Sequence, residues 1–251
     1  MIDDAPIGAF LDDVASERVT PAGGTVVAVA GAMGAALCEM ACIHTSAARS
    51  PGTETDAADD AVDDDIAADT ADDIADDDAA DDIVDDDTAD DRSDTTDFDS
   101  IRADLAGHRR RLLALAAEDA TLVDDLFGSG TTSTSRDGDA DDGSTESSDR
   151  FAKRAAGIPL ATAETSVAVL EAAAVVIDRG NPRVAADAKA GAYLVDAAVR
   201  ASLATVRTNV EALDDASYAA RLDERSARIA ATAAELRRDV FSEPTDDGGD
   251  R

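Results

Sequence analysis

The sequence predicts an all-α protein, an antiparallel helical bundle, and three observations support this fold. Apolar residues recur at helical spacing in several long blocks, and no stretch of useful length alternates as a β-strand does. Aromatic residues make up only 3% of the chain and Trp is absent, so small side chains must fill the core, which favours closely packed helices. With 251 residues, 44% of them hydrophobic, the chain can form one domain, which we expect to span residues 1–251.

The chain is strongly acidic, with a formal net charge of −34, and its only lysines are Lys153 and Lys189. Adaptation to molar salt covers protein surfaces with carboxylates, whose mutual repulsion is screened at high ionic strength. The alternative is a specific basic partner. Because the acidic residues are spread over the whole chain, we favour the first explanation, a halophilic origin. The same charge argues against binding to nucleic acid.

The first ordered block, residues 7–48, begins with a short amphipathic turn or helix at 10–15. A breaker follows, Thr20-Pro21-Ala22-Gly23-Gly24-Thr25, and then an apolar helix. Pro and paired Gly before a helix expose backbone N–H groups, which can hold an anion or a polar ring edge. A plain helix-entry turn is the more common meaning of Gly-Gly. Gly31 and Gly34 would let a neighbouring backbone approach closely.

The apolar run from Thr25 to Cys38 is shorter than the roughly 20 residues that cross a membrane. We expect a helix at the centre of a bundle or oligomer, and no membrane insertion. No basic segment with a cleavage pattern opens the chain, which predicts a cytoplasmic protein. Cys38 and Cys42 are interpreted as buried helix residues. A disulfide or metal site is less favoured, because no second cysteine pair could complete a zinc site. We therefore expect no metal.

Two polar segments interrupt the ordered blocks. Residues 51–97 contain near-repetitive Ala-Asp-Asp units with few apolar residues, which predicts a disordered or salt-dependent insert. A calcium-binding repeat is the functional alternative, but the segment lacks the glycines that such loops need. Residues 128–149 are rich in Gly, Ser, Thr and Asp, and they predict a flexible loop.

Helices are predicted over residues 98–127, from Pro159 to about Ile177, over 185–213 and over 218–240. Pro159 suits the first turn of a helix, and Gly180 suits a helix end. Asp187 falls in the first turn of the next helix, where the helix dipole favours a carboxylate. On composition alone it is an ordinary N-terminal charge.

Taken in order, the ordered blocks resemble the cyclodeaminase/cyclohydrolase family of tetrahydrofolate enzymes over nearly all of the ordered chain. No single motif is specific, but their order and spacing together are. The residues that carry the resemblance are Phe10-Leu11 with Thr20-Pro21-Ala22-Gly23-Gly24-Thr25; Ala117-Glu118-Asp119-Ala120; Ile158-Pro159-Leu160; Gly180-Asn181-Pro182 with Asp187; and Arg207-Thr208-Asn209-Val210.

The resemblance implies a helical homodimer that closes or opens the one-carbon bridge between N5 and N10 of tetrahydrofolate. Asp187 matches the family's catalytic aspartate, so it is the expected general acid/base. The loop residues Pro21, Gly23 and Gly24 are expected to contact the folate, and Asn181 is expected to shape the turn that aims Asp187.

Arg207 and Asn209 are weaker candidates, either for substrate contact or for packing across the dimer. No cofactor is implied besides the tetrahydrofolate derivative that serves as substrate. We recognise no formiminotransferase domain in this chain, which is compatible with a free-standing cyclohydrolase or with a cyclodeaminase that receives its substrate from a separate formiminotransferase.

The chain departs from the family pattern at three places. The basic residue common after the first apolar helix is missing in its usual form, with His44 and Arg49 nearby. Ala22 replaces the first Gly of a Pro-Gly-Gly-Gly loop, and Ala186 replaces the Ser that usually precedes the catalytic Asp. A folate also carries a glutamate tail, so the site should gather positive charge. The candidates for that charge are Arg49 and the run from Arg109 to Arg111.

The motifs do not separate two chemistries. Cyclodeaminases turn 5-formimidoyltetrahydrofolate into 5,10-methenyltetrahydrofolate and release ammonia, whereas cyclohydrolases hydrate the methenyl bridge to 10-formyltetrahydrofolate. Both pass through a tetrahedral carbon and need a group that moves protons. Cyclodeaminase is our first hypothesis and cyclohydrolase the second; a non-catalytic folate-binding or scaffold dimer is the third. An Asp187 that faces Gly23 and Gly24 across a pocket would favour an enzyme, and one in open solvent a binder.

Overall fold

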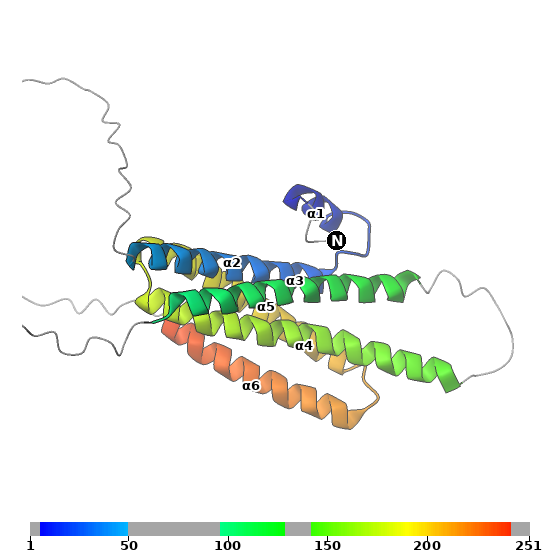
Figure 1. Ribbon diagram of the computed structural model, residues 1–251. Coiled ribbons are helices and arrows are strands. Elements are labelled where there is room, and N and C mark those ends of the chain that lie inside the picture. Colours follow the sequence, from blue (N-terminus) through cyan, green and yellow to red (C-terminus); the bar gives the residue numbers. More distant parts are fainter. Residues whose placement is uncertain (1–5, 50–95, 129–141, 242–251) are drawn as a thin grey trace, which may run out of the picture. The chain divides into compact units, whose positions relative to one another are not determined.

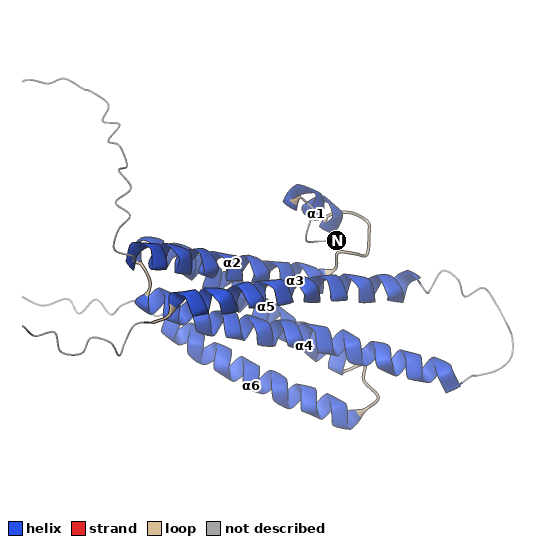
Figure 2. Cartoon of the chain, in the orientation of Figure 1, coloured by secondary structure: helices blue, strands red, loops and turns tan. Residues whose placement is uncertain are grey.

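The computed structural model describes residues 6–49, 96–128 and 142–241, and every regular element in these ranges is a helix (Figures 1 and 2). The all-α prediction is therefore confirmed for the described chain. The predicted insert lies outside these residues, except for its last two positions, and so does most of the predicted loop over 128–149. The elements are α1 (Ile7–Val14), α2 (Gly23–Arg49), α3 (Phe98–Gly128), α4 (Asp142–Arg179), the 3-10 turn η3 (Pro182–Val184), α5 (Ala185–Val210) and α6 (Ala216–Phe241).

Helix α4 differs most from the prediction. It begins at Asp142, so the end of the predicted 128–149 loop is helical, and Pro159 lies inside the helix instead of at its first turn. A proline normally ends or kinks a helix, because it lacks the N–H that bonds to the carbonyl four residues earlier. The prediction was wrong because a residue far along the sequence, described below, satisfies that carbonyl.

Aspartates cap the starts of α3 and α6. Asp97 accepts the backbone amides of Asp99 and Ser100, both at 3.1 Å, so it belongs to the start of α3 and not to the insert. Asp215 accepts the Tyr218 amide at 2.9 Å and the Ser217 hydroxyl at 2.8 Å. These two bonds, together with Lys153, lower the pKa of Asp215 to about 2.

The helices run in alternating directions. Thr25 and Glu39 of α2 contact Asp119 and Arg109 of α3, respectively, so these two helices are antiparallel. Helices α4 and α5 are joined by the short turn η3 and pack side by side, which makes them antiparallel as well (Figure 1). Helix α6 then returns along both of them. The described chain forms the predicted antiparallel bundle.

Helices α2 and α5 touch through two glycines. A Cβ on Gly34 would lie 2.6 Å from the carbonyl oxygen of Gly191 and 2.5 Å from Val195 Cγ2. A Cβ on Gly191 would lie 2.7 Å from the Gly34 oxygen and 3.0 Å from the sulfur of Cys38. Real Cβ contacts are not this short, so a side chain at either position would push the two backbones apart.

Most of the core consists of small and branched aliphatic side chains, as expected from the shortage of aromatic residues, and Phe98 is a buried aromatic member. Cys38 and Cys42 belong to it as free, buried thiols, and burial raises the pKa of Cys38 to about 12 and that of Cys42 to about 11. Both thiols therefore remain protonated and unreactive at neutral pH. The cluster also includes Ala35, Ala41, Leu105, Leu112, Val169, Leu170, Ala173, Ala192 and Val195.

Two helices are long and apolar enough, by length and composition, to cross a membrane: α2 and residues 148–179 of α4. Helix α2 has 27 residues, so it is longer than the apolar run from which the sequence argued against insertion. Half of the apolar window of each helix is buried inside the bundle. Core helices of soluble proteins can have the same length and apolar composition, so these two properties alone do not show that either helix crosses a membrane.

A buried carboxylate links α5 to α6. Asp196 is only 3% exposed, and its Oδ1 accepts a hydrogen bond from Nε of Arg237 on α6 at 2.9 Å. Its Oδ2 pairs with Arg200, one turn further along α5, at 3.2 Å. The Arg237 side chain is 38% exposed and that of Arg200 64%. Arg237 therefore compensates more of the buried negative charge of Asp196 than Arg200 does.

We expect Arg237→Met to lower the free energy of unfolding by about 3 kcal/mol, because it leaves a buried carboxylate with one exposed partner. Arg200→Met should cost less than about 1 kcal/mol, as exposed ion pairs usually do. Chemical denaturation in molar KCl measures both values. Equal losses from the two substitutions would contradict the unequal roles of the two arginines.

Candidate functional site

The turn between α4 and α5 is fastened to the C-terminal end of α2. The Asn181 amide donates to the buried Thr45 hydroxyl at 2.9 Å, and its side-chain Nδ2 donates to the His44 carbonyl at 3.4 Å. The side-chain oxygen of Asn181 accepts the Arg183 amide at 3.0 Å and so caps η3. Asn181 thus fixes the point from which α5 starts.

Asp187 lies in the first turn of α5 and is exposed in this chain. The next residue, Ala188, is buried, and its carbonyl oxygen lies 3.8 Å from the sulfur of Cys38 on α2. The backbone that carries Asp187 is therefore held against the core, while the carboxylate itself projects to the surface.

The glycine loop lies against α3. Gly23 is exposed and has open space where a Cβ would be, whereas a Cβ on Gly24 would lie 2.4 Å from Oδ1 of Asp119. Oδ2 of Asp119 accepts the Thr25 hydroxyl at 2.8 Å. Pro21, at the entry to this loop, is partly buried. The start of α2 is thus held by a carboxylate from a different helix.

The predicted site residues fall at two ends of the antiparallel α2/α5 pair. Asn181 and Asp187 lie at the end where α2 finishes, and Gly23 and Gly24 lie at the end where α2 begins. Twenty residues of α-helix span about 30 Å, which separates Asp187 from the far end of α5. Within a single chain, Asp187 therefore does not face the glycine loop. A site formed by one chain alone would require the two to face each other.

Asn209 serves the fold of its own chain. Its Nδ2 donates to the carbonyl of Ala155 at 2.6 Å, and Ala155 precedes Pro159 by four residues. Pro159 has no N–H for that carbonyl, so the Asn209 side chain supplies the missing donor from α5. Two of the motifs that carried the family resemblance, around Pro159 and around Asn209, are thus halves of one interaction.

Arg207 lies on the last turn of α5, where it is exposed and lines a shallow cavity of about 230 Å³ between α5 and α6. Asp223 of α6 lines the same cavity. Arg207 is thus far from Asp187 in its own chain and shares no cavity with the glycine loop among the pockets described.

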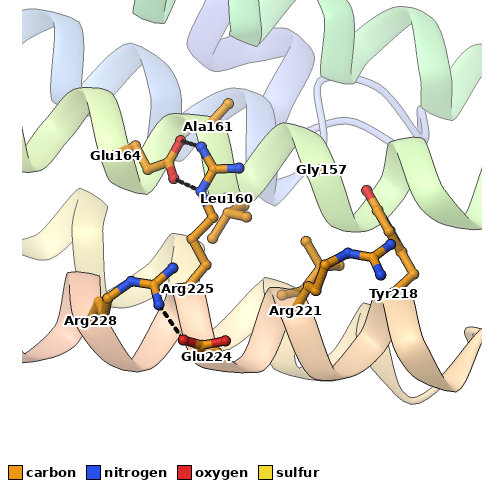
Figure 3. A pocket seen from close by; sticks show the side chains of 10 residues that line it. Gly157, Leu160, Ala161, Glu164, Tyr218, Arg221, Glu224, Arg225 and Arg228 are labelled. Carbon is orange, nitrogen blue, oxygen red and sulfur yellow. Dashed lines mark hydrogen bonds and ion pairs between the residues drawn. The ribbon is translucent and has the colours of Figure 1, made fainter.

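A larger pocket of about 410 Å³ separates α4 from α6 (Figure 3). Three arginines of α6 line it, but Arg225 is paired with Glu164 of α4 and Arg228 with Glu224. Arg221 lies over the Tyr218 ring, 5.4 Å from its centroid. None of the predicted site residues lines this pocket, and most of its positive charge is already compensated.

A neighbouring pocket of about 340 Å³, next to Tyr218, is more basic. Glu118 is the acidic residue among those that line it, and the basic ones are Arg111, Arg150, Lys153 and Arg154. Arg111 is paired with Glu118 at 3.4 Å, and Lys153 is paired with Asp149 and Asp215, so among the described residues Arg150 and Arg154 supply the uncompensated positive charge of this pocket. Of the other arginines expected to meet a glutamate tail, Arg109 pairs with Glu39 at 3.0 Å and Arg49 donates to the Arg179 carbonyl at 3.0 Å.

Among the residues that the structure describes, no group of three His, Cys, Asp or Glu side chains is placed to hold a metal ion.

The bundle has the architecture of known folate enzymes. The crystal structure of formiminotetrahydrofolate cyclodeaminase from Thermotoga maritima superposes with a TM-score of 0.68 over 96% of both chains, at 18% identity, which is a likeness of fold. The methenyltetrahydrofolate cyclohydrolase of Methylorubrum extorquens is 25% identical over 229 residues, which cover 91% of this chain and 90% of that protein.

The family model described as formiminotransferase-cyclodeaminase matches residues 6–89 and 85–228. The chain belongs to this family, which agrees with the resemblance found in its sequence.

No role was predicted for Asp119, although this residue belongs to one of the motifs that carry the family resemblance. The signal that could have found it is the pair of small residues at Gly23 and Gly24, because a glycine at a helix start leaves room for a side chain from elsewhere. Which side chain fills that room depends on the packing of α2 on α3, which no local pattern encodes.

We expect Asn209→Leu to destabilise the fold by about 1–3 kcal/mol, because it leaves the Ala155 carbonyl unsatisfied. In a Pro159→Ala background the restored N–H satisfies that carbonyl, so the same substitution should cost clearly less. A double-mutant cycle on the free energy of unfolding measures this coupling. If the effects of Asn209→Leu and Pro159→Ala on the free energy of unfolding are additive, the Asn209 side chain does not replace the missing N–H of Pro159.

Proposed function

We propose that this chain is an enzyme of one-carbon metabolism that acts on the N5/N10 bridge of tetrahydrofolate, as a 5,10-methenyltetrahydrofolate cyclohydrolase. The observation that carries the proposal is similarity to a methenyltetrahydrofolate cyclohydrolase over nine tenths of both chains, supported by a family match over residues 85–228, a range that includes Asp187. The reaction uses water and needs no cofactor besides the folate substrate.

The chemistry assigns Asp187 a proton-transfer role. The methenyl carbon is the electrophilic centre of a cationic bridge, and the carboxylate accepts a proton from the water that attacks it. The tetrahedral carbon then keeps its bond to N10, the bond to N5 breaks, and N5 takes up a proton. The product is 10-formyltetrahydrofolate, with one proton released overall. A carboxylate beside the bridge also stabilises its positive charge.

A cyclodeaminase is the second candidate, and the description of the matching family favours it. In that reaction N10 attacks the formimidoyl carbon on N5, and the amino group leaves as ammonia once it is protonated. The same carboxylate would supply that proton. The two reactions share one constellation and differ in the leaving group, so the assay must offer both substrates.

We further propose a homodimer in which each site is completed by the other chain. Asp187 and Gly23 lie at opposite ends of the antiparallel α2/α5 pair, and Asp187 is exposed in the single chain. A two-fold axis across this pair would place the Asp187 end of one chain beside the glycine loop of the other. A solvent-exposed Asp187 in the assembled protein would instead suit the non-catalytic binder.

The outer face of α2 supports such a dimer. Met33 is 48% exposed and Ile43 46% exposed, and Ala36 between them is exposed too. These residues recur at helical spacing on a helix that runs from the glycine loop to the Asn181 turn. A second copy is the occupant that would cover this apolar stripe and join both halves of the site.

The folate's glutamate tail would lie in the basic pocket beside Tyr218. Glu118 lines that pocket, and the adjacent residue Asp119 contacts the glycine loop, so the two features occupy neighbouring faces of α3. Arg150 and Arg154 have no acidic partner among the described residues, which leaves them able to bind carboxylates. We place the protein in the cytoplasm of a salt-adapted cell, in keeping with its acidic surface.

The purified protein in molar KCl should lower the absorbance of 5,10-methenyltetrahydrofolate faster than the uncatalysed reaction, and Asp187→Asn should reduce this rate by about 10²-fold or more. Growth of the methenyl signal from 5-formimidoyltetrahydrofolate, with ammonia release, would instead identify a cyclodeaminase. If neither signal changes, or if Asp187→Asn equals the wild type, the catalytic role of Asp187 is lost and the binder remains.

Mixing two inactive variants tests the shared site. Gly23→Val adds bulk where the chain leaves open space, and Asp187→Asn removes the proton carrier. After subunit exchange, mixed dimers hold one native site each, so we expect about a quarter of the wild-type activity. No recovery, although sedimentation confirms mixed dimers, would place each site within one chain.

A further inference from the structure

Asp119 of α3 meets the glycine loop at two adjacent residues. Oδ2 accepts the Thr25 hydroxyl at 2.8 Å, and Oδ1 occupies the space beside Gly24, where a Cβ would approach it to 2.4 Å. Thr25 is fully buried, so its hydroxyl has no access to water as an alternative partner. The two contacts fix both the position and the rotation of the first turn of α2.

The negative charge of Asp119 also affects which part of a ligand can bind at the glycine loop. The start of a long helix carries partial positive charge and free N–H groups, which normally attract an anion. Here Asp119 already supplies negative charge at that position. The carboxylates of a glutamate tail are therefore disfavoured at the loop, whereas N–H donors of a pterin ring or a cationic bridge are favoured.

We propose that Asp119 is a positioning residue of the active site, which holds Gly23, Gly24 and Thr25 in the geometry that receives the ring end of the folate. The proposal rests on the proposed function, because the loop needs a defined geometry only if it meets substrate. A purely structural tie between α2 and α3 is the alternative. It would affect stability and leave the kinetics of the folded protein unchanged.

The first experiment measures kcat and KM for the methenyl substrate, in molar KCl and at a temperature where every variant is folded by circular dichroism. We expect Asp119→Ala to lower kcat/KM by about 10²-fold, the loss that a small misplacement of substrate produces. Asp119→Asn keeps an oxygen for the Thr25 hydroxyl and should recover part of this loss. Thr25→Val should show the defect, and Thr25→Ser should not.

Asp104→Asn is the matched control. Asp104 is an exposed aspartate on the same helix, remote from the loop, so its kinetics should equal those of the wild type. If folded Asp119→Ala turns over with wild-type kcat and KM, the positioning role is overturned and the tie is structural. If the wild-type protein acts on neither folate substrate, the proposed function fails first, and the positioning role falls with it.

A double substitution distinguishes the steric contact between residue 24 and Asp119 from the positioning role of the Asp119 carboxylate. Gly24→Ala places a methyl group against Asp119 and should destabilise the fold, and Asp119→Ser in the same chain makes room and should restore stability. The double variant still lacks the carboxylate, so we expect it to remain at least tenfold below wild-type kcat/KM. Recovery of full activity together with stability would overturn the proposal.

Discussion

The close approach of α2 and α5 at Gly34 and Gly191 is the constraint on which the rest of the bundle depends. Each glycine lies against the other's carbonyl oxygen, with no space for a Cβ. That contact fixes the distance and the antiparallel direction of the two central helices. The other core helices then pack mainly alanines, valines and leucines against this pair, with Phe98 as a buried aromatic member of the cluster.

The fixed pair also determines where chemistry can occur. Side chains on a rigid helix pair keep their separation, so Asp187 and the glycine loop remain at opposite ends whatever the loops do. The chain strengthens each end separately, with Asn181 bound to the end of α2 and Asp119 bound to its beginning. Each half of the candidate site is thus preorganised, although one chain does not contain both halves at one place.

The sequence predicted the all-α fold and most helix ends well, because these depend on local signals. Asp97 and Gly180 mark helix boundaries through contacts within a few residues. The start of α4 could not be predicted, because Pro159 is tolerated only through Asn209, fifty positions later. Site residues were predicted by resemblance, but their grouping into two ends required the direction in which α5 packs on α2. The role of Asp119 was missed for the same reason.

The local charges at the two parts of the candidate site belong to a protein that is strongly acidic overall. In molar salt, exposed charges act over only a few ångströms, so long-range steering of an anionic folate is weak. Under the proposed function, recognition would then rest on short-range contacts: guanidinium groups at the basic pocket for the tail, and Asp119 at the loop against it. Opposite local charges on neighbouring faces of α3 would in that case give a folate substrate a single orientation. The overall charge of −34 can therefore serve solubility without weakening binding, because the contacts that choose the orientation are shorter than the screening length.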